Sequence, residues 1–550
     1  MKKYTVGLDF GSLSVRAVLA DTENGRELAS AVYEYPHAVI TDRLPSGKEI
    51  PLGWALQPPG DYLEGLSETV GEAVRLSGVS AEDIVGIGID FTANTYLPVN
   101  DRYEPLCLES RWENEPHAWV KMWKHNSTQK YAEAMEQKAR ERQEPFLKYY
   151  SDTVSSAWML PRLYETLEEA PALYEAAYRF MEAGDWIVTK LTGMEKRSAS
   201  FASIKAFYVE GLGYPPDSFF ASLDPRFEHV IDEKLARSVY PQGTCAGGLN
   251  RNGAALTGLP EGIPVAVANI DATAGVPCSG VTGPGILHMT LGTSSVYNIL
   301  HTEFHEVQGT GGITKGGVIP GLYGYESGQN CVGDCLNWFV ENCVPPSYYE
   351  AAKQQDKNIH QYLTELAERL EPGESGLLAL DWWNGNRAVL CDYDLTGLLL
   401  GLTLRTKPEE IYRALIEALA FGTRKIVETL AAAGVPAGSA VACGGITRKN
   451  PLYMQIHADV LNMEIKIARS DQTSALGSAI FGAVAAGSKK GGYDTISEAV
   501  LAMGGAGDLV YRPIREHTEI YNGLYTEFCT LHDYFGRGEN TVMKKLRSIR

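Results

Sequence analysis

Two glycine-containing turns carry residues that are suited to binding a phosphate. They are Asp9-Phe10-Gly11-Ser12-Leu13-Ser14 and Leu291-Gly292-Thr293-Ser294-Ser295. Glycine lets the backbone approach a phosphate closely, and successive N–H groups with Ser or Thr hydroxyls can donate to its oxygens. Each turn alone is more often an ordinary hairpin. Their occurrence in both halves of the chain, with a third glycine site, favours phosphate binding.

The third site is Ala442-Cys443-Gly444-Gly445, which leads to a helix expected to start near Asn450. A strand that runs into a glycine pair and a helix N-terminus could accept the adenosine and a phosphate. The alternative is an ordinary strand-to-helix turn with Asn450 as the helix N-cap. Two common nucleotide folds do not fit, because the chain has no G-x-x-x-x-G-K-[ST] and no G-x-G-x-x-G between a strand and a helix.

Two aspartates end apolar segments and could do chemistry. Asp9 could hold Mg²⁺ through water, since Mg²⁺ prefers a few carboxylates and keeps several waters. Asp271 could accept a proton from an attacking hydroxyl group. The plainer alternatives are a capping contact within the turn for Asp9 and, because Ala272-Thr273-Ala274 follows, a helix N-cap or turn residue for Asp271.

The elements that must position these residues alternate between strands and helices. In the first half we expect strands at Tyr4–Leu8, Val15–Asp21, near Leu28–Tyr35 and at Ile84–Ile89, a helix from Asp61, and mostly helix over 115–182. In the second half we expect strands at Val265–Asn269, Gly285–Leu291, Ser295–Leu300 and Glu464–Ile467, and helices at Glu409–Ala433, Pro451–Leu461 and Thr473–Ala486. Each half begins with strand, Gly-Ser/Thr turn and strand. This predicts a duplicated α/β domain, a boundary close to residue 262 and a ligand cleft between the halves.

The composition of the chain excludes some classes of binding partner. The chain has 550 residues and a net charge of −19, so it should be repelled by nucleic acid and by anionic membranes. Nine scattered cysteines do not form a disulfide framework. No signal peptide and no apolar run of about 18 residues is recognisable. We therefore expect a soluble, cytoplasmic protein with neither nucleic acid nor membrane as partner.

Taken together, the motifs resemble the FGGY carbohydrate kinases, within the superfamily of actin, sugar kinases and heat-shock ATPases. The motifs are Gly7-Leu8-Asp9-Phe10-Gly11-Ser12, Ile87-Gly88-Ile89-Asp90, Asn269-Ile270-Asp271, Gly292-Thr293-Ser294, and Cys443-Gly444-Gly445 with Gln455, Ala458 and Asp459. The resemblance implies two actin-like (ribonuclease-H-like) ATPase domains with a ligand cleft between them. It implies an N-terminal, sugar-binding domain over 1–262 and a C-terminal, ATP-binding domain with the catalytic aspartate over 263–550.

The resemblance also implies roles for single residues. Asp271 matches the catalytic base, and Asp9 the residue that organises Mg²⁺. The residues implied to bind ATP are Gly11, Ser12, Gly292, Thr293, Gly444, Gly445 and Asn450. Those implied to bind the sugar are Ala93, Trp123, Lys205, Asp271 and Glu326. The alternatives are a strand end for Ala93, a core tryptophan for Trp123, a solvated surface lysine for Lys205 and a polar turn for Glu326.

Three segments resemble those members of the family that phosphorylate L-ribulose. They are Trp123-Lys124-His125, Tyr325-Glu326-Ser327-Gly328-Gln329 and Leu380–Arg387. The implied activity is transfer of phosphate from ATP to L-ribulose in L-arabinose catabolism. Thr273 replaces a usual histidine and Ser327 a usual alanine. Another ketose or polyol kinase (for D-ribulose, ribitol or xylulose) and an actin-like ATPase that acts on no sugar therefore stay open. Family members often form homodimers, and the sequence does not decide the oligomeric state.

Overall fold

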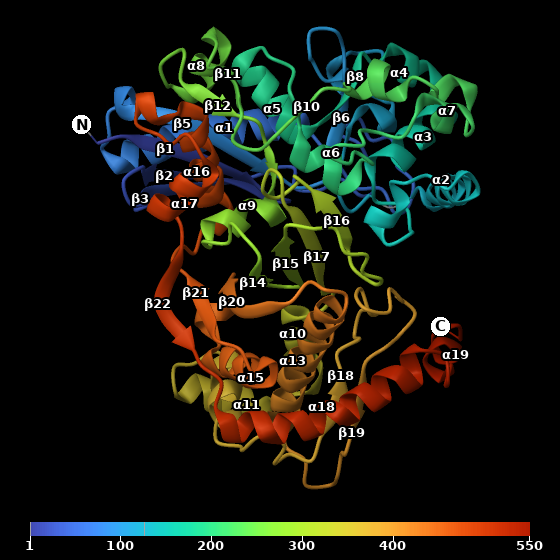
Figure 1. Ribbon diagram of the computed structural model, residues 1–550, viewed down its shortest axis with the longest axis vertical. Helices are drawn as coiled ribbons and strands as arrows, with labels where there is room; N and C mark the ends of the chain where they lie inside the picture. The colour runs from blue at the N-terminus through green and yellow to red at the C-terminus, as the bar shows by residue number, and fades with distance from the viewer. Residues whose placement is uncertain (1, 126, 550) are drawn as a thin grey trace. The chain divides into compact units, whose positions relative to one another are not determined.

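The protein is described by a computed structural model that covers residues 2–125 and 127–549. The chain divides into two compact units (Figure 1). Unit 1 consists of Met1–Thr282, Ile313–Gly324 and Gln472–Gly505. Unit 2 consists of Gly283–Gly312, Tyr325–Asp471 and Ala506–Arg550. Each unit is an α/β structure built on a twisted sheet, as the alternating pattern predicts.

The main sheet of unit 1 mixes an antiparallel hairpin with parallel strands. Its order is β11-β12-β5-β1-β2-β3, and β13 also pairs with β5. The strands are β1 (Tyr4–Phe10), β2 (Ser14–Asp21), β3 (Glu27–Glu34), β5 (Ile84–Phe91), β11 (Cys245–Gly248), β12 (Pro264–Ala266) and β13 (Asn269–Ile270). β1, β2 and β3 pair antiparallel, whereas β5 runs parallel to β1, β12 and β13. Every residue of β5 is buried, which places this strand at the centre of the core.

The domain boundary predicted at 262–263 falls inside unit 1. β12 follows it directly, and Val265 of β12 pairs with Ile87 of β5 in the first sheet. Strand pairing therefore joins residues 264–270 to the N-terminal segment, although Gly262-Ile263-Pro264 looks like the start of a new domain in the sequence. Asp271 consequently belongs to unit 1 and not to the C-terminal unit.

Helix α16 (Thr473–Ala486) crosses back to unit 1 and lies directly on its sheet (Figure 1). Glycines on the strands make this possible: a Cβ on Gly88 would lie 1.7 Å from the carbonyl oxygen of Ser478, and one on Gly7 would lie 1.8 Å from that of Ala475. The helix backbone thus touches the sheet with no side chain between them. Helix α1 (Pro59–Ser77) packs against β2 and β3.

Unit 1 also contains a smaller sheet and several helices. The sheet has the order β4-β7-β6-β8. Its strands are β4 (Leu56–Gln57), β6 (Tyr96–Val99), β7 (Val120–Lys121) and β8 (Arg179–Glu182). The helices include α2 (Gln129–Arg142), α3 (Met159–Glu169), α4 (Pro171–Ala176), α5 (Ala183–Thr192), α6 (Ala199–Lys205), α7 (Asp217–Ala221), α8 (Arg251–Thr257), α9 (Asp271–Cys278) and α17 (Ile496–Met503). The helical expectation for 115–182 holds for α2, α3 and α4, but β7 and β8 interrupt it.

The sheet of unit 2 repeats the plan of unit 1. Its order is β17-β15-β14-β20-β21-β22. The strands are β14 (Gly285–Leu291), β15 (Ser295–His301), β17 (Tyr323–Gln329), β20 (Ala437–Cys443), β21 (Ile465–Ala468) and β22 (Ala506–Tyr511). β14 pairs antiparallel with β15 and parallel with β20, just as β1 pairs with β2 and β5. The predicted duplication is therefore present in the strand pairing.

Helices surround the sheet of unit 2. They include α10 (Gly333–Cys343), α11 (Pro346–Gln354), α12 (Ile359–Ala367), α13 (Pro408–Ala432), α14 (Ile446–Lys449), α15 (Pro451–Leu461), α18 (Arg515–Gly536) and α19 (Val542–Arg547). A hairpin of β18 (Leu378–Leu380) and β19 (Leu398–Leu400) packs beside α13. Among residues 2–125 and 127–549, no helix combines the length and the hydropathy needed to cross a membrane.

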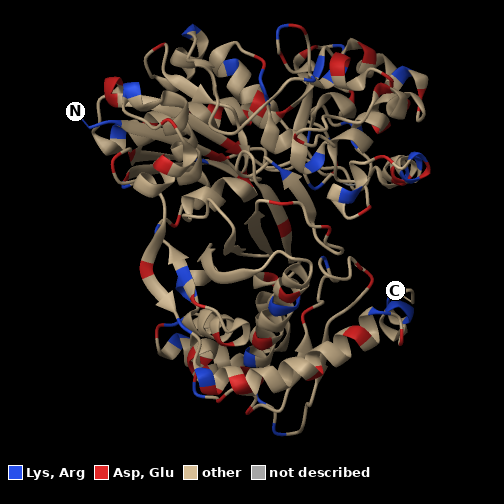
Figure 2. Cartoon of the chain, in the orientation of Figure 1, with Lys and Arg blue, Asp and Glu red and all other residues tan. Residues whose placement is uncertain are grey.

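Basic and acidic side chains are interspersed over both units (Figure 2). The basic residues of α19 gather near the C-terminus, and two of them pair with acidic groups of a nearby loop. Lys544 forms an ion pair with Asp392, and Arg547 lies 3.6 Å from Asp394. The charges of Lys544 and Arg547 are therefore compensated within the chain itself.

Candidate active site

Three carboxylates of unit 1 stand where adjacent strands end. Asp9 lies near the end of β1, Asp90 near the end of β5, and Asp271 directly after β13. Asp9 is in register with Asp90, and Asp90 with Asn269. Since β1, β5 and β13 run parallel, their ends meet at one edge of the sheet, where ligands of open α/β sheets bind. Asp9 and Asp271, which the sequence singles out for separate roles, are thus brought to the same edge.

Burial dominates the electrostatics of these carboxylates. It raises the pKa of Asp9, while a hydrogen bond with Asp90 and the charge of Arg16, whose Nη1 lies 3.8 Å from Oδ2, oppose the rise. Burial raises the pKa of Asp90 still further, and the neighbouring Asp9 and Asp271 carboxylates add to the effect. Ser478 of α16 opposes it by donating from Oγ to Oδ2 of Asp90 at 2.6 Å. Of these two carboxylates, Asp90 therefore holds a proton more readily than Asp9.

Asp271 is the first residue of α9, and the backbone fixes it tightly. Its Oδ1 accepts the N–H of Ala272 at 2.6 Å, and its carbonyl oxygen accepts the hydroxyl of Ser474 at 3.1 Å. The local contact expected of a turn aspartate is thus present. It does not exclude a second role, because a carboxylate has two oxygens and about four lone-pair sites.

Ala93 and Trp123 lie close to the first glycine turn. Ala93 follows β5 and is buried, and the next residue, Asn94, has a left-handed φ of +54°. The indole N–H of Trp123 donates to the hydroxyl of Ser12 at 2.8 Å. Trp123 is 46% exposed, so the alternative of a core tryptophan is wrong. An accessible indole face beside Ser12 is suited to stacking on the apolar face of a sugar.

Lys205 is the last residue of α6 and is half-buried, which argues against a fully solvated lysine. Helix α6 is joined to β13 through Ser200, whose hydroxyl accepts the N–H of Ile270 at 3.2 Å and lies 3.5 Å from that of Thr273. Lys205 and Asp271 therefore stand on elements that are directly bonded to each other. Thr273 itself is buried and donates to the carbonyl of Ile270 at 3.1 Å.

In unit 2, Glu326 on β17 pairs with an arginine. Its Oε1 accepts Nη2 of Arg387 at 2.7 Å, and both side chains are largely buried. Its carbonyl oxygen accepts the N–H of Gly311 at 2.8 Å. Sequence reasoning assigned Arg387 no role beyond its place in a resembling segment, because Glu326 and Arg387 are 61 positions apart.

The second and third glycine sites prove to be neighbours within unit 2. The N–H of Gly292 bonds the carbonyl of Ser294 at 3.0 Å, and the N–H of Gly333 bonds that of Gly292 at 3.0 Å. Gly444 has a φ of +96°, and a Cβ there would lie 2.2 Å from the carbonyl oxygen of Leu291. Only glycine fits this position, and it brings the turn after β20 against the turn after β14.

Asn450 acts as a helix N-cap, which is the alternative to nucleotide binding that the sequence leaves open for this residue. Its side-chain oxygen accepts the N–H of Tyr453 at 2.9 Å, which satisfies a free donor at the start of α15. Asp459 on the same helix accepts from the backbone N–H of Ile514 at 2.7 Å and lies 2.9 Å from Nδ1 of His517. Asp459 thus ties α15 to α18, so a structural role accounts for its place in the motif.

Comparison with known proteins agrees with this architecture. The family models of the N-terminal and C-terminal domains of the FGGY family of carbohydrate kinases match residues 4–278 and 287–486. The fold of two actin-like (ribonuclease-H-like) domains is therefore that of a sugar kinase. The chain belongs to the FGGY family of carbohydrate kinases.

The relatives extend over the whole chain. It is 50% identical to "Ribulokinase" of Halalkalibacterium halodurans, over 100% of this chain and 98% of the relative. It is 42% identical to "Ribulokinase" of Mycolicibacterium smegmatis, over 100% and 96%. Among solved structures, xylulose kinase from Rhodospirillum rubrum matches with a TM-score of 0.77 at 23% identity, over 96% and 98% of the two chains. The gluconate kinase of Lactobacillus acidophilus matches with a TM-score of 0.77 at 17% identity, over 98% and 99%. The predicted fold and enzyme class are confirmed.

Proposed function

We propose that the chain is an ATP-dependent kinase that phosphorylates L-ribulose to L-ribulose 5-phosphate in the use of L-arabinose. The observation that carries the proposal is the identity of about one half, over the full length, to proteins named ribulokinase. The match to the first of these relatives covers 100% of this chain and 98% of the relative. The segments around Trp123 and Glu326 support the same substrate.

In the proposed reaction Asp271 is the general base. It accepts the proton of the sugar hydroxyl that attacks the terminal phosphate of ATP, and the phosphate leaves ADP for that oxygen. Two features support this role: Asp271 follows a buried strand of the main sheet, and it stands on an element bonded to the helix that carries Lys205. Lys205 would donate to sugar oxygens and Glu326 would accept from sugar hydroxyls. Ala93 would allow the backbone to approach the sugar.

The nucleotide would use the glycine turns. Backbone N–H groups at Gly11, Gly292, Gly444 and Gly445, with the hydroxyls of Ser12 and Thr293, suit the phosphates. Asn450 can also take part, because its capping contact from the N–H of Tyr453 uses only one of the two lone pairs of Oδ1.

Mg²⁺ fits the acidic edge of unit 1. Residues 2–125 and 127–549 contain no group of three or more His, Cys, Asp or Glu side chains arranged to hold a metal. A single carboxylate, Asp9, completed by water and by nucleotide oxygens, matches the preference of Mg²⁺. When bound, the ion would neutralise charge on the phosphates. Asp90 would not compete as a ligand while it holds its proton.

The test is release of ADP from ATP and Mg²⁺ with L-ribulose, D-ribulose, D-xylulose, L-xylulose, ribitol or no sugar. A clear preference for L-ribulose supports the proposal. Preference for another sugar would keep the kinase mechanism and reject the substrate, with Thr273 and Ser327 as the first positions to exchange. ADP release that no sugar increases would favour an actin-like ATPase that acts on no sugar.

A further inference from the structure

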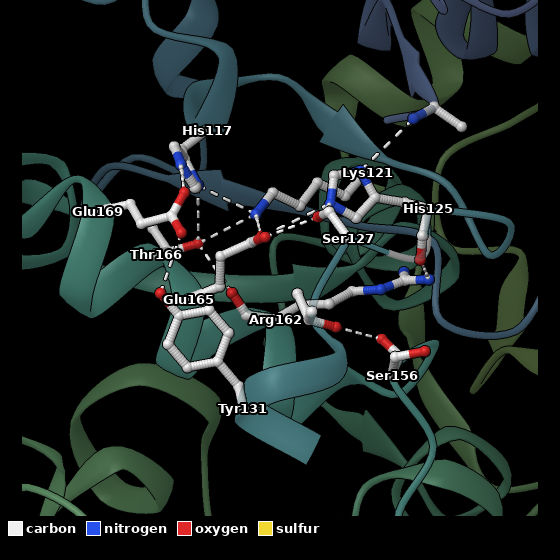
Figure 3. A network of polar contacts seen from close by, with 12 residues as sticks. His117, Lys121, His125, Ser127, Tyr131, Ser156, Arg162, Glu165, Thr166 and Glu169 are labelled. Carbon is white, nitrogen blue, oxygen red and sulfur yellow. Dashed lines mark hydrogen bonds and ion pairs between the residues drawn. The ribbon is translucent and has the colours of Figure 1, made fainter. Parts of the chain in front are cut away.

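Arg162 of α3 is completely buried and binds the backbone of two loops. Figure 3 shows its contact with His125 in one of them. Its Nη1 donates to the carbonyl oxygens of Asn94 at 2.8 Å and Met122 at 2.9 Å. Its Nη2 donates to those of Trp123 at 2.8 Å and His125. One guanidinium group thus joins the turn after β5 to the loop after β7. Arginine is the only side chain that can bind four carbonyl groups in this way, because its planar guanidinium carries five N–H donors.

Both loops carry residues that the proposed function assigns to the sugar. Ala93 directly precedes Asn94, whose left-handed φ of +54° costs free energy in a residue other than glycine. Trp123 is itself one of the residues bound by Arg162, and its own N–H donates to the hydroxyl of Thr95 at 3.3 Å. The contacts of Arg162 therefore hold the turn at Asn94 and the backbone of Trp123 in fixed relation.

The guanidinium keeps its charge in this site. Burial lowers the pKa of Arg162 to about 10, while Tyr96, Glu182 and Glu165 oppose the decrease. At neutral pH the group remains protonated. Its hydrogen bonds to the carbonyls are therefore bonds from a charged donor, which are about twice as strong as neutral ones.

A second polar cluster fixes the far end of the Trp123 loop (Figure 3). Lys121 and Glu165 form a fully buried ion pair at 2.7 Å. Ser127 donates to Oε1 of Glu165 at 2.6 Å and lies 2.9 Å from Nε2 of His125. Nδ1 of His125 accepts the N–H of Ala55 at 3.4 Å, so the proton of the ring is on Nε2. Burial lowers the pKa of His125 to about 3, and the ring is neutral.

We infer that Arg162 is a positioning residue for the sugar: it fixes the Ala93–Asn94 backbone and Trp123 before the sugar binds. The inference rests on the proposed function, because that function makes Ala93 and Trp123 sugar contacts. Arg162 touches no substrate itself, and it acts by removing the cost of ordering the two loops during binding.

The test compares Arg162→Lys with the wild type. Lysine keeps the charge, but its ammonium is a point donor that cannot reach all four carbonyls. We expect the KM for L-ribulose to rise about tenfold or more, equivalent to about 1.4 kcal/mol, and the KM for ATP to change less than about twofold. Arg413→Lys is the matched control. Arg413 is also buried and bonds the carbonyls of Ala367 and Leu370, but it lies in unit 2 and bonds none of the sugar residues.

An unchanged KM for L-ribulose in Arg162→Lys would overturn the inference, as would an equal rise for Arg413→Lys. If Arg162→Lys does not fold, hydrogen exchange of the wild type decides the matter. The amides of Trp123 and His125 should exchange slowly without sugar, and exchange as fast as in an unstructured peptide would contradict a preformed loop. If the wild type prefers another sugar, the proposed substrate fails, and the same KM ratios are measured with the sugar that it does phosphorylate.

Discussion

The contact of helix α16 with the sheet of unit 1 makes a sharp prediction for Gly88→Ala. An added Cβ would lie 1.7 Å from the carbonyl oxygen of Ser478 and 2.5 Å from its carbon. An ordinary contact of these atoms needs about 3.4 Å, so the helix must retreat by more than about 1 Å. Backbone atoms cannot rotate away. We therefore expect a loss at the upper end of overpacking effects, about 3 kcal/mol.

The same displacement should reach the acidic cluster. Ser478 donates to Asp90 at 2.6 Å, and a retreat of the helix stretches this bond. A loss of about 3 kcal/mol corresponds to a decrease in melting temperature of about 4 °C for a unit of about 330 residues. Thermal unfolding measured by circular dichroism, together with the rate of sugar phosphorylation, checks both effects.

Gly71→Ala is the matched control. Gly71 lies inside α1, and a Cβ there meets nothing within 4 Å. Alanine in a helix interior should stabilise the protein by about 0.5–1 kcal/mol. The same substitution thus has opposite signs at the two positions. If Gly88→Ala were as stable as Gly71→Ala, the direct packing of the helix backbone on β5 would be refuted.

Two further predictions concern unit 2. Burial raises the pKa of Asp381 from 3.8 to about 6, with a hydrogen bond from Gln329 opposing the rise, so the folded state binds this proton more tightly than the unfolded chain. The free energy of unfolding should therefore decrease as the pH rises from about 4 to about 6. Asp381→Asn should raise the free energy of unfolding by up to about 3 kcal/mol at pH 7 but change it little at pH 4. Urea unfolding at both pH values measures this, and an equal effect at both would contradict the prediction. Arg387→Met removes the partner of Glu326 at 2.7 Å and should raise the KM for the sugar about tenfold. Initial rates over a range of sugar and ATP concentrations test this, and a rise confined to the KM for ATP would speak against Glu326 as a sugar ligand.

Local elements were predictable where the residue pattern is local. Helices at Pro451–Leu461 and Thr473–Ala486 have the predicted bounds, because proline and a glycine mark their ends. The sequence does not show on which sheet helix Thr473–Ala486 packs, because the apolar residues of this helix face no single direction. The glycines at positions 7, 86 and 88 were the available signal: each has a Cβ position that the helix backbone occupies.

The boundary at 262 was predicted in the wrong place, and Arg162 was not predicted to have any role. The reasons differ. β12 pairs with a strand about 180 positions earlier, and pairing at that distance leaves no mark in one sequence. Arg162 binds carbonyl oxygens, which every residue has, so no motif points to it. By contrast, Asp9 and Asp271 were recognisable because each ends an apolar strand. Their shared edge became visible only with the register of β1, β5 and β13.

The most direct test of the central claim is the turnover of L-ribulose by Asp271→Asn. Asparagine keeps the shape of the side chain but cannot accept the proton. We expect kcat to fall by about 10²–10⁴-fold, with the melting temperature and the KM for ATP nearly unchanged. Asp101→Asn, at an exposed aspartate of a turn, serves as the control and should retain full activity. An Asp271→Asn enzyme with wild-type kcat on L-ribulose would contradict the assignment of the general base and, with it, the proposed mechanism.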